Sequence, residues 1–212
     1  MLFRSCMERA VIWNVLCDTY QREIERYGAS SMELSERLFG VDSRYTLALL
    51  GLLAGSPTAE QDRWQLSLRL IDDTLSVFGY AAEDKKELLE KMSVGFKTEF
   101  GFTGSTFNKQ LNDKFRMQRK SVEGVFDPQA DPLGAYADPL EMRLREMESL
   151  VVQVSPLIEQ ESIEKDDYVR SIIHMTMNRL FRSKNRLYEM VIYDFLFRYY
   201  QSALARIKYA KK

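Results

Sequence analysis

The stretch AEQDRWQLSLRLIDDTLSVF, residues Ala59–Phe78, decides the fold class because its apolar residues are not confined to one helical face. A helix at a protein surface usually carries only three or four apolar residues in every two turns, all on one side. Here the apolar positions are Trp64, Leu66, Leu68, Leu70, Ile71, Leu75, Val77 and Phe78. We therefore predict a well-buried helix over residues 59–78.

Helical patterns continue on both sides of this segment. A short helix should follow Asp18 and end before Gly28, and Asp42 with Ser43 should cap a helix that runs through Leu53. The other predicted helices are Met32–Phe39, capped by Ser30 or Ser31, Glu83–Phe100, Thr106–Val125, Pro139–Glu161, Asp166–Ser183, capped by Asp166, and Arg186–Lys208. The short connections between the last three predict that they are antiparallel neighbours.

A strand and a loop complete this picture. Ala10–Cys17, AVIWNVLC, is short, β-branched and aromatic, and it is the one convincing strand. Residues 126–139 contain three prolines and a glycine, which predicts an irregular loop within a single domain spanning 1–212. The fold class is α+β and predominantly α-helical, with about seven to eight helices and one or a few N-terminal strands. Because an orphan strand exposes an unpaired edge, we expect instability or self-association, for instance as a homodimer.

The overall composition excludes several classes of protein. Thirty basic and 31 acidic residues give a net charge of -1, so no long-range field attracts nucleic acid or an anionic membrane surface. No apolar run reaches the roughly 18 residues that a membrane span requires, and Cys6 and Cys17 lack metal-ligand spacing. We expect a cytoplasmic protein with no metal and no cofactor, and no direct contact with nucleic acid or membrane.

The only histidine of the chain, His174, lies on a predicted helix. Arg170, His174 and Asn178 fall at i, i+4 and i+8, so they form a polar stripe on a largely apolar segment. A histidine exchanges protons near neutral pH, and an asparagine one turn away could orient it or bind a substrate. On spacing alone, a structural histidine with internal partners is the more common outcome.

A second polar cluster follows the predicted strand. Arg22 and Arg26 lie four residues apart, and Glu23 neighbours Arg26 at i, i+3. Two cations on one helical face repel each other unless an anion joins them. An anionic ligand is one solution, and a solvated helix whose glutamates compensate the arginines is the other and more common one.

Several segments, in this order along the chain, carry a family resemblance. They are DTY at Asp18–Tyr20, REIERYG at Arg22–Gly28, MEL at Met32–Leu34, ERLF at Glu36–Phe39, Asp42–Ser43, HM at His174–Met175 and NRLF at Asn178–Phe181. Together they resemble the C-terminal, glutamate-eliminating domain of class I lantibiotic dehydratases, also called the thiopeptide-type bacteriocin biosynthesis domain. The resemblance spans nearly the whole chain.

The resemblance implies a lyase that acts on a ribosomal precursor peptide. In that family a separate glutamylation domain first esterifies a serine or threonine, and the C-terminal domain then eliminates glutamate to leave dehydroalanine or dehydrobutyrine. The resemblance places catalytic roles on His174, Arg26 and Glu23. We also expect Arg22, Asn178 and Arg179 to bind the substrate. The implied partners are the precursor peptide and the glutamylation domain or protein.

One departure from the family pattern keeps other functions open. The family carries an Arg-x-Arg pair upstream of the strand, and Arg4 and Arg9 do not reproduce it, so the resemblance implies a domain that lacks its N-terminal part. One alternative is a non-catalytic module that binds the precursor peptide or docks on a glutamylation protein. Another is the related cycloaddition enzyme that forms pyridine rings in thiopeptides.

Overall fold

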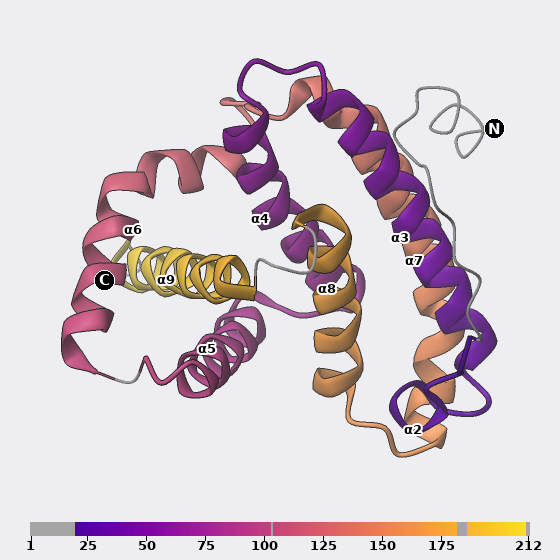
Figure 1. Ribbon diagram of the computed structural model, residues 1–212. Coiled ribbons are helices and arrows are strands. Elements are labelled where there is room, and N and C mark those ends of the chain that lie inside the picture. Colours follow the sequence, from indigo (N-terminus) through magenta and orange to yellow (C-terminus); the bar gives the residue numbers. More distant parts are fainter. Residues whose placement is uncertain (1–19, 103, 182–185, 211–212) are drawn as a thin grey trace.

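The computed structural model describes residues 20–102, 104–181 and 186–210 as a set of packed helices (Figure 1). These are α2 (Ile24–Tyr27), α3 (Met32–Leu53), α4 (Ala59–Val77), α5 (Ala82–Glu99), α6 (Ser105–Val125), the short 3₁₀ helix η1 (Gly134–Tyr136), α7 (Ala137–Gln160), α8 (Lys165–Phe181) and α9 (Arg186–Ala210). The prediction of a predominantly helical fold is confirmed. The described ranges contain no strand, so the α+β assignment is not borne out there, and the predicted strand Ala10–Cys17 lies outside them.

Helix α4 is the buried centre that its sequence predicts. Leu66, Leu68, Leu70, Ile71 and Leu75 are all fully buried. The helix contacts α3, α6, α7, α8 and α9, so neighbours surround it on several sides. Burying an aliphatic side chain fully contributes about 1.5–3 kcal/mol relative to leaving it exposed. Since these side chains point to several sides of α4, several other helices have to pack around it to bury them.

The helices pack in two groups around α4 and α8. Helix α3 lies along α7, α5 lies along α9, and α8 stands between them in Figure 1 and contacts both α3 and α4. The prediction that α7, α8 and α9 are antiparallel neighbours is wrong, because α7 packs chiefly on α3, and α9 packs chiefly on α5. Aromatic contacts such as Phe96 with Tyr193, at 5.5 Å between ring centroids, join α5 to α9.

The N-terminal helices differ from their prediction. Helix α3 is continuous over Met32–Leu53 instead of forming two helices, and α2 spans only Ile24–Tyr27. The backbone remains helical through Gly40, so this glycine does not end α3. Ser31 makes no capping bond to α3, and its hydroxyl donates instead to the carbonyl of Tyr27.

Asp42, predicted as a cap, is instead the acceptor of a buried ionic network. Arg143 Nε of α7 donates to Asp42 Oδ1 at 2.9 Å, and Arg179 Nη1 of α8 donates to Asp42 Oδ2 at 2.8 Å. Arg143 also donates to Thr74 Oγ1 of α4 at 3.1 Å. Asp42 and Arg143 are 2% and 1% exposed, so one carboxylate ties α3 to α7 and α8 in the interior.

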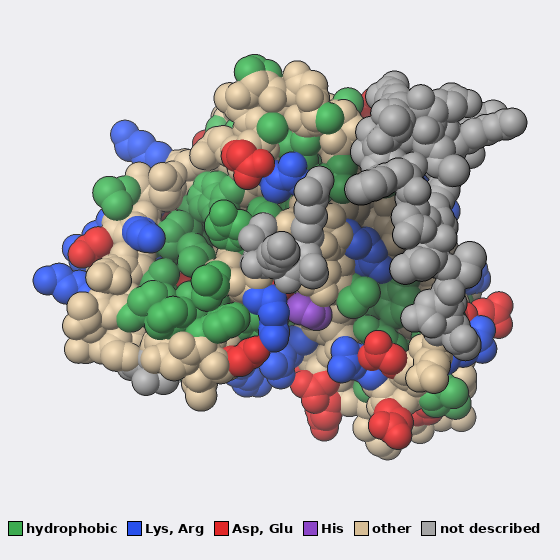
Figure 2. Space-filling view, viewed as in Figure 1, with side chains coloured by type: hydrophobic (Ala, Val, Ile, Leu, Met, Phe, Trp, Pro, Cys, Tyr) green, Lys and Arg blue, Asp and Glu red, His purple; other side chains and the backbone are tan. Residues whose placement is uncertain are grey.

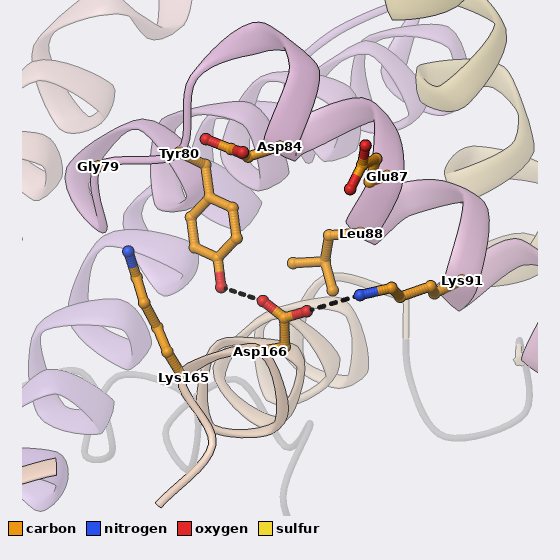
Figure 3. Close-up of a pocket in the computed structure, with 8 residues that line it drawn as sticks. All are labelled: Gly79, Tyr80, Asp84, Glu87, Leu88, Lys91, Lys165 and Asp166. Carbon is orange, nitrogen blue, oxygen red and sulfur yellow. Dashed lines mark hydrogen bonds and ion pairs between the residues drawn. The ribbon is translucent and has the colours of Figure 1, made fainter. Parts of the chain in front are cut away.

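The start of α8 is held by a second set of polar contacts, around a cavity of about 230 Å³ (Figure 3). Asp166 does not cap the helix, because α8 already begins at Lys165. Its carboxylate accepts hydrogen bonds from the Tyr80 hydroxyl at 2.7 Å and from Lys91 Nζ at 3.2 Å. Lys165 Nζ lies 4.5 Å from the centre of the Tyr80 ring. These contacts fix α8 against the turn between α4 and α5.

The predicted loop 126–139 is irregular over most of its length. It contains η1, and α7 begins at Ala137, two residues before Pro139. Proline is tolerated in the first turn of a helix because the backbone N–H it lacks has no partner within the helix there. Tyr136 ends η1 and donates its hydroxyl to Asp62 Oδ2 of α4 at 2.7 Å, which anchors this loop to the central helix.

Candidate functional site

His174 lies on α8 with both ring nitrogens in contact with protein groups. Its Nδ1 is 2.9 Å from Oε2 of Glu189 on α9, and its Nε2 is 3.1 Å from Nδ2 of Asn178, one turn later on α8. The side chain of His174 is 32% exposed, whereas that of Glu189 is 3% exposed. His174 and Asn178 therefore lie on one face of α8, as the predicted polar stripe requires. The imidazole ring of His174 lies between the buried carboxylate of Glu189 and the solvent.

Glu189 is the residue of this site that the sequence prediction missed. Its Oε2 also accepts a hydrogen bond from the Tyr193 hydroxyl at 2.9 Å. Burial and the neighbouring Glu189 carboxylate raise the pKa of Tyr193 well above its ordinary value. One signal was present in the sequence: Glu189 and Asp194 are isolated carboxylates in the apolar run EMVIYD of a predicted helix, and a buried carboxylate requires partners.

The two arginines of the N-terminal cluster each have their own carboxylate. Arg22 binds Glu36 of α3 through two hydrogen bonds of 2.9 and 2.7 Å, and Arg26 Nε lies 3.2 Å from Glu23 Oε2. Arg22 and Glu23 lie before α2, so the predicted helical face does not form, and each arginine is compensated by its own carboxylate. Arg22, Glu23 and Arg26 nevertheless remain more than half exposed and are accessible to a ligand.

An open groove brings the two clusters together. It has a volume of about 1180 Å³, and four arginines, five acidic residues and His174 line it together with apolar side chains. The predicted residues Arg22, Glu23, Arg26 and His174 all belong to this lining. Figure 2 shows the histidine at the surface with Lys and Arg side chains beside it. Residues about 150 positions apart in the sequence therefore share one groove, with cations, carboxylates and a proton-exchanging ring.

A family model for the lantibiotic biosynthesis dehydratase C-terminal region matches residues 1–200 of the 212-residue chain. The chain belongs to this dehydratase family. No curated protein and no solved structure matches it. Membership gives the chain a role in lantibiotic biosynthesis, in the dehydration of a precursor peptide.

In this dehydratase domain, the turn after α2 is fastened to the end of α7. The carboxylate of Glu161 accepts hydrogen bonds from the backbone N–H groups of Ala29 and Ser30 and from the Ser30 hydroxyl. These bonds lower the pKa of Glu161 below its ordinary value. Because Glu161 and the residues after it line the groove, the contact sets where Glu23 and Arg26 lie relative to α8.

Gly28 is required for this contact. Its backbone has φ +82° and ψ 150°, a region that residues other than glycine rarely adopt. A Cβ there would lie 2.5 Å from Glu161 Oε2, 2.6 Å from Ser31 Oγ and 2.7 Å from Ile163 Cδ1. The glycine of the REIERYG segment thus allows the backbone to close on Glu161.

Asn178 and Arg179 do not line this groove. Asn178 contacts His174, as described above, and Arg179 pairs with Asp42 while lining a separate pocket of about 370 Å³ between α2, α3 and α8. That pocket also includes Glu23, so Glu23 lies at the boundary of both spaces. Burial raises the pKa of Tyr27, which lies on the same pocket. Substrate binding by Asn178 and Arg179 therefore stays a prediction.

Two further properties follow from the described part of the dehydratase domain. Over residues 20–102, 104–181 and 186–210, no group of three or more His, Cys, Asp or Glu residues is placed to hold a metal ion. In the same ranges, no helix is both long and apolar enough to cross a membrane.

Proposed function

We propose that this chain eliminates glutamate from glutamylated serine or threonine residues of a ribosomal precursor peptide, leaving dehydroalanine or dehydrobutyrine. The observation that carries the proposal is the shared groove of His174 and the Arg26–Glu23 pair. The partners are the precursor peptide and the domain or protein that glutamylates it. Family membership supports this peptide substrate, since it associates the chain with lantibiotic dehydration.

The elimination needs two kinds of group, a base and a cation, and the groove contains both. A base removes the proton from Cα, a cation stabilises the developing enolate, and the Cβ–O ester bond then breaks so that glutamate leaves and the Cα=Cβ double bond forms. We assign the proton transfer to His174 and the stabilisation of negative charge to Arg26. Glu23, 3.2 Å from Arg26 Nε, orients that guanidinium.

The size of the groove suits a peptide ester. Pockets for small molecules usually have volumes of about 300–1,000 Å³, whereas this groove measures about 1180 Å³ and is open to solvent. A peptide segment could therefore lie along it, with its esterified side chain directed to His174. Arg22, Arg170 and Arg186 also line the groove and supply further cations for the glutamyl carboxylates.

The direct test is to incubate the chain and its glutamylation partner with a glutamylated precursor peptide and to follow the loss of glutamate by mass spectrometry. His174→Ala and Arg26→Ala should each lower the rate by about 10²–10⁴-fold. Arg116→Ala is the matched control, because Arg116 forms an exposed i, i+3 pair with Asp113 on α6, as Arg26 of α2 does with Glu23 just before that helix. The control should keep the wild-type rate.

Two outcomes would contradict the proposal. In the first, the wild-type chain binds the glutamylated peptide but removes no glutamate from it, and the His174→Ala variant binds the peptide equally well. The chain would then be a binding module. If a substrate with two dehydrated residues is converted to a pyridine ring, the chain is a cycloaddition enzyme.

A further inference from the structure

We propose that Glu189 is a positioning residue that holds His174 with its proton on Nδ1 and so makes Nε2 the nitrogen that exchanges a proton with the substrate. The inference deepens the proposed function and rests on it for the identity of the substrate. Its structural basis is a chain of contacts from Tyr193 through Glu189 and His174 to Asn178, which joins α9 to α8.

The first observation is the difference in burial between the two partners. The side chain of Glu189 is 3% exposed and is not among those that line the groove, whereas that of His174 is. A substrate in the groove can therefore reach His174 but not Glu189. Glu189 can affect the substrate only through its contact with the imidazole ring of His174. A buried carboxylate is retained only where hydrogen-bond donors satisfy it, and Glu189 Oε2 has two neighbours able to donate, Tyr193 and His174.

The second observation is that the two neighbours of the ring specify the same tautomer. An ionised carboxylate only accepts, so Nδ1 must donate to Glu189. The Nδ2 amide group of Asn178 only donates, so Nε2 must accept from it. With Nδ1–H on the buried side, the lone pair lies on Nε2, where a substrate has to displace the Asn178 bond.

The sole histidine permits a direct spectroscopic test. His174 is the only histidine in the sequence, so NMR of the protein with isotope-labelled histidine shows the two nitrogens of a single ring. At a pH where the ring is neutral, the wild type should show a protonated Nδ1 and an unprotonated Nε2. A ring protonated mainly on Nε2 would overturn the proposal.

Three variants separate positioning from a general structural effect. Glu189→Met removes the acceptor and should shift the ring toward the Nε2–H form, whereas Glu189→Gln retains an acceptor oxygen and should restore the Nδ1–H form. Tyr193→Phe is the matched control, since it removes the other bond to Glu189 and leaves the histidine contact. Retention of the Nδ1–H form in a folded Glu189→Met protein would overturn the proposal.

The kinetic test uses the glutamylated peptide. Glu189→Met should lower kcat by roughly 10²-fold with KM nearly unchanged, and Glu189→Gln should recover most of the loss. An equal loss in both variants, or an effect confined to KM, would count against positioning. The NMR result does not depend on turnover. If His174 carries its proton on Nδ1 but the chain eliminates no glutamate, the proposed function is refuted while the positioning of His174 by Glu189 is supported.

Discussion

The backbone nitrogen of Ala29 donates a hydrogen bond to Glu161 Oε2 at 2.7 Å, which joins the turn after α2 to the residue after α7. The same carboxylate accepts bonds from the backbone and side chain of Ser30. His174 lies on α8, which follows Glu161 after a short connection. The position of Arg26 relative to His174 therefore depends on a contact that involves neither residue.

The Glu161 contact should make stability depend on pH in the acid range. Its pKa is lowered in the folded chain from an ordinary value of 4.5, so its stabilisation is present above pH 4.5 and is lost as the pH falls through the lowered value. Glu161→Gln should melt below the wild type at neutral pH, and the difference should shrink toward zero in strong acid. Thermal melts followed by circular dichroism measure this, and a pH-independent difference would contradict it.

Gly28→Ala should lower the free energy of unfolding by about 1–3 kcal/mol, because alanine is strained at this φ and ψ and its Cβ would collide with Glu161. Gly40→Ala is the control, since Gly40 lies within α3 and a Cβ there meets nothing within 4 Å. That variant should gain about 0.4–1 kcal/mol. Urea unfolding of both proteins gives the comparison, and similar effects at the two glycines would rule out a special role for Gly28.

Asp42→Ala should cost about 3–5 kcal/mol of stability, since it removes the carboxylate that accepts a hydrogen bond from the buried guanidinium of Arg143. Glu141→Ala removes the partner of Arg145 on the same α7 helix, but that pair is exposed and should cost only about 0–1 kcal/mol. Chemical denaturation measures both values. A small effect of Asp42→Ala would show that Thr74 and water satisfy Arg143 without the ion pair.

Tyr193 should keep its phenol proton in alkaline solution for as long as the chain is folded. Burial and Glu189 raise the pKa of Tyr193 above the ordinary value of 10.0. Above pH 10.0 this phenol therefore ionises only in the unfolded chain, which lowers the free energy of unfolding as the pH rises. In an ultraviolet titration of phenolate, Tyr193→Phe should show the same number of ionising groups as the folded wild type. In denaturant, Tyr193→Phe should show one ionising tyrosine fewer than the wild type. If the folded variant already shows one fewer than the folded wild type, Tyr193 ionises in the folded chain and the argument from burial is wrong.

The features that sequence predicted best depend on local patterns. Helices α4, α5 and α6 agree with their predicted ranges within one or two residues, because apolar spacing depends only on near neighbours. The predicted break near Gly40 failed because Asp42 is satisfied by Arg143, a residue 101 positions away. His174 could be selected from its polar stripe and from the family resemblance. The partnership of Glu189 with His174 could not be predicted from its isolated charge, since it exists only where the first turn of α9 meets α8 in the folded chain.

The bond between Ala29 and Glu161 also has a consequence for the newly synthesised chain. Its two ends are 132 residues apart, so it cannot form until Glu161 has left the ribosome. Contacts of such long sequence separation form late, because the entropy of closing the intervening loop must be overcome first. Helices α3 and α6 can contact α4 earlier, while the groove stays incomplete. A nascent chain should thus become competent to hold a peptide in one late step.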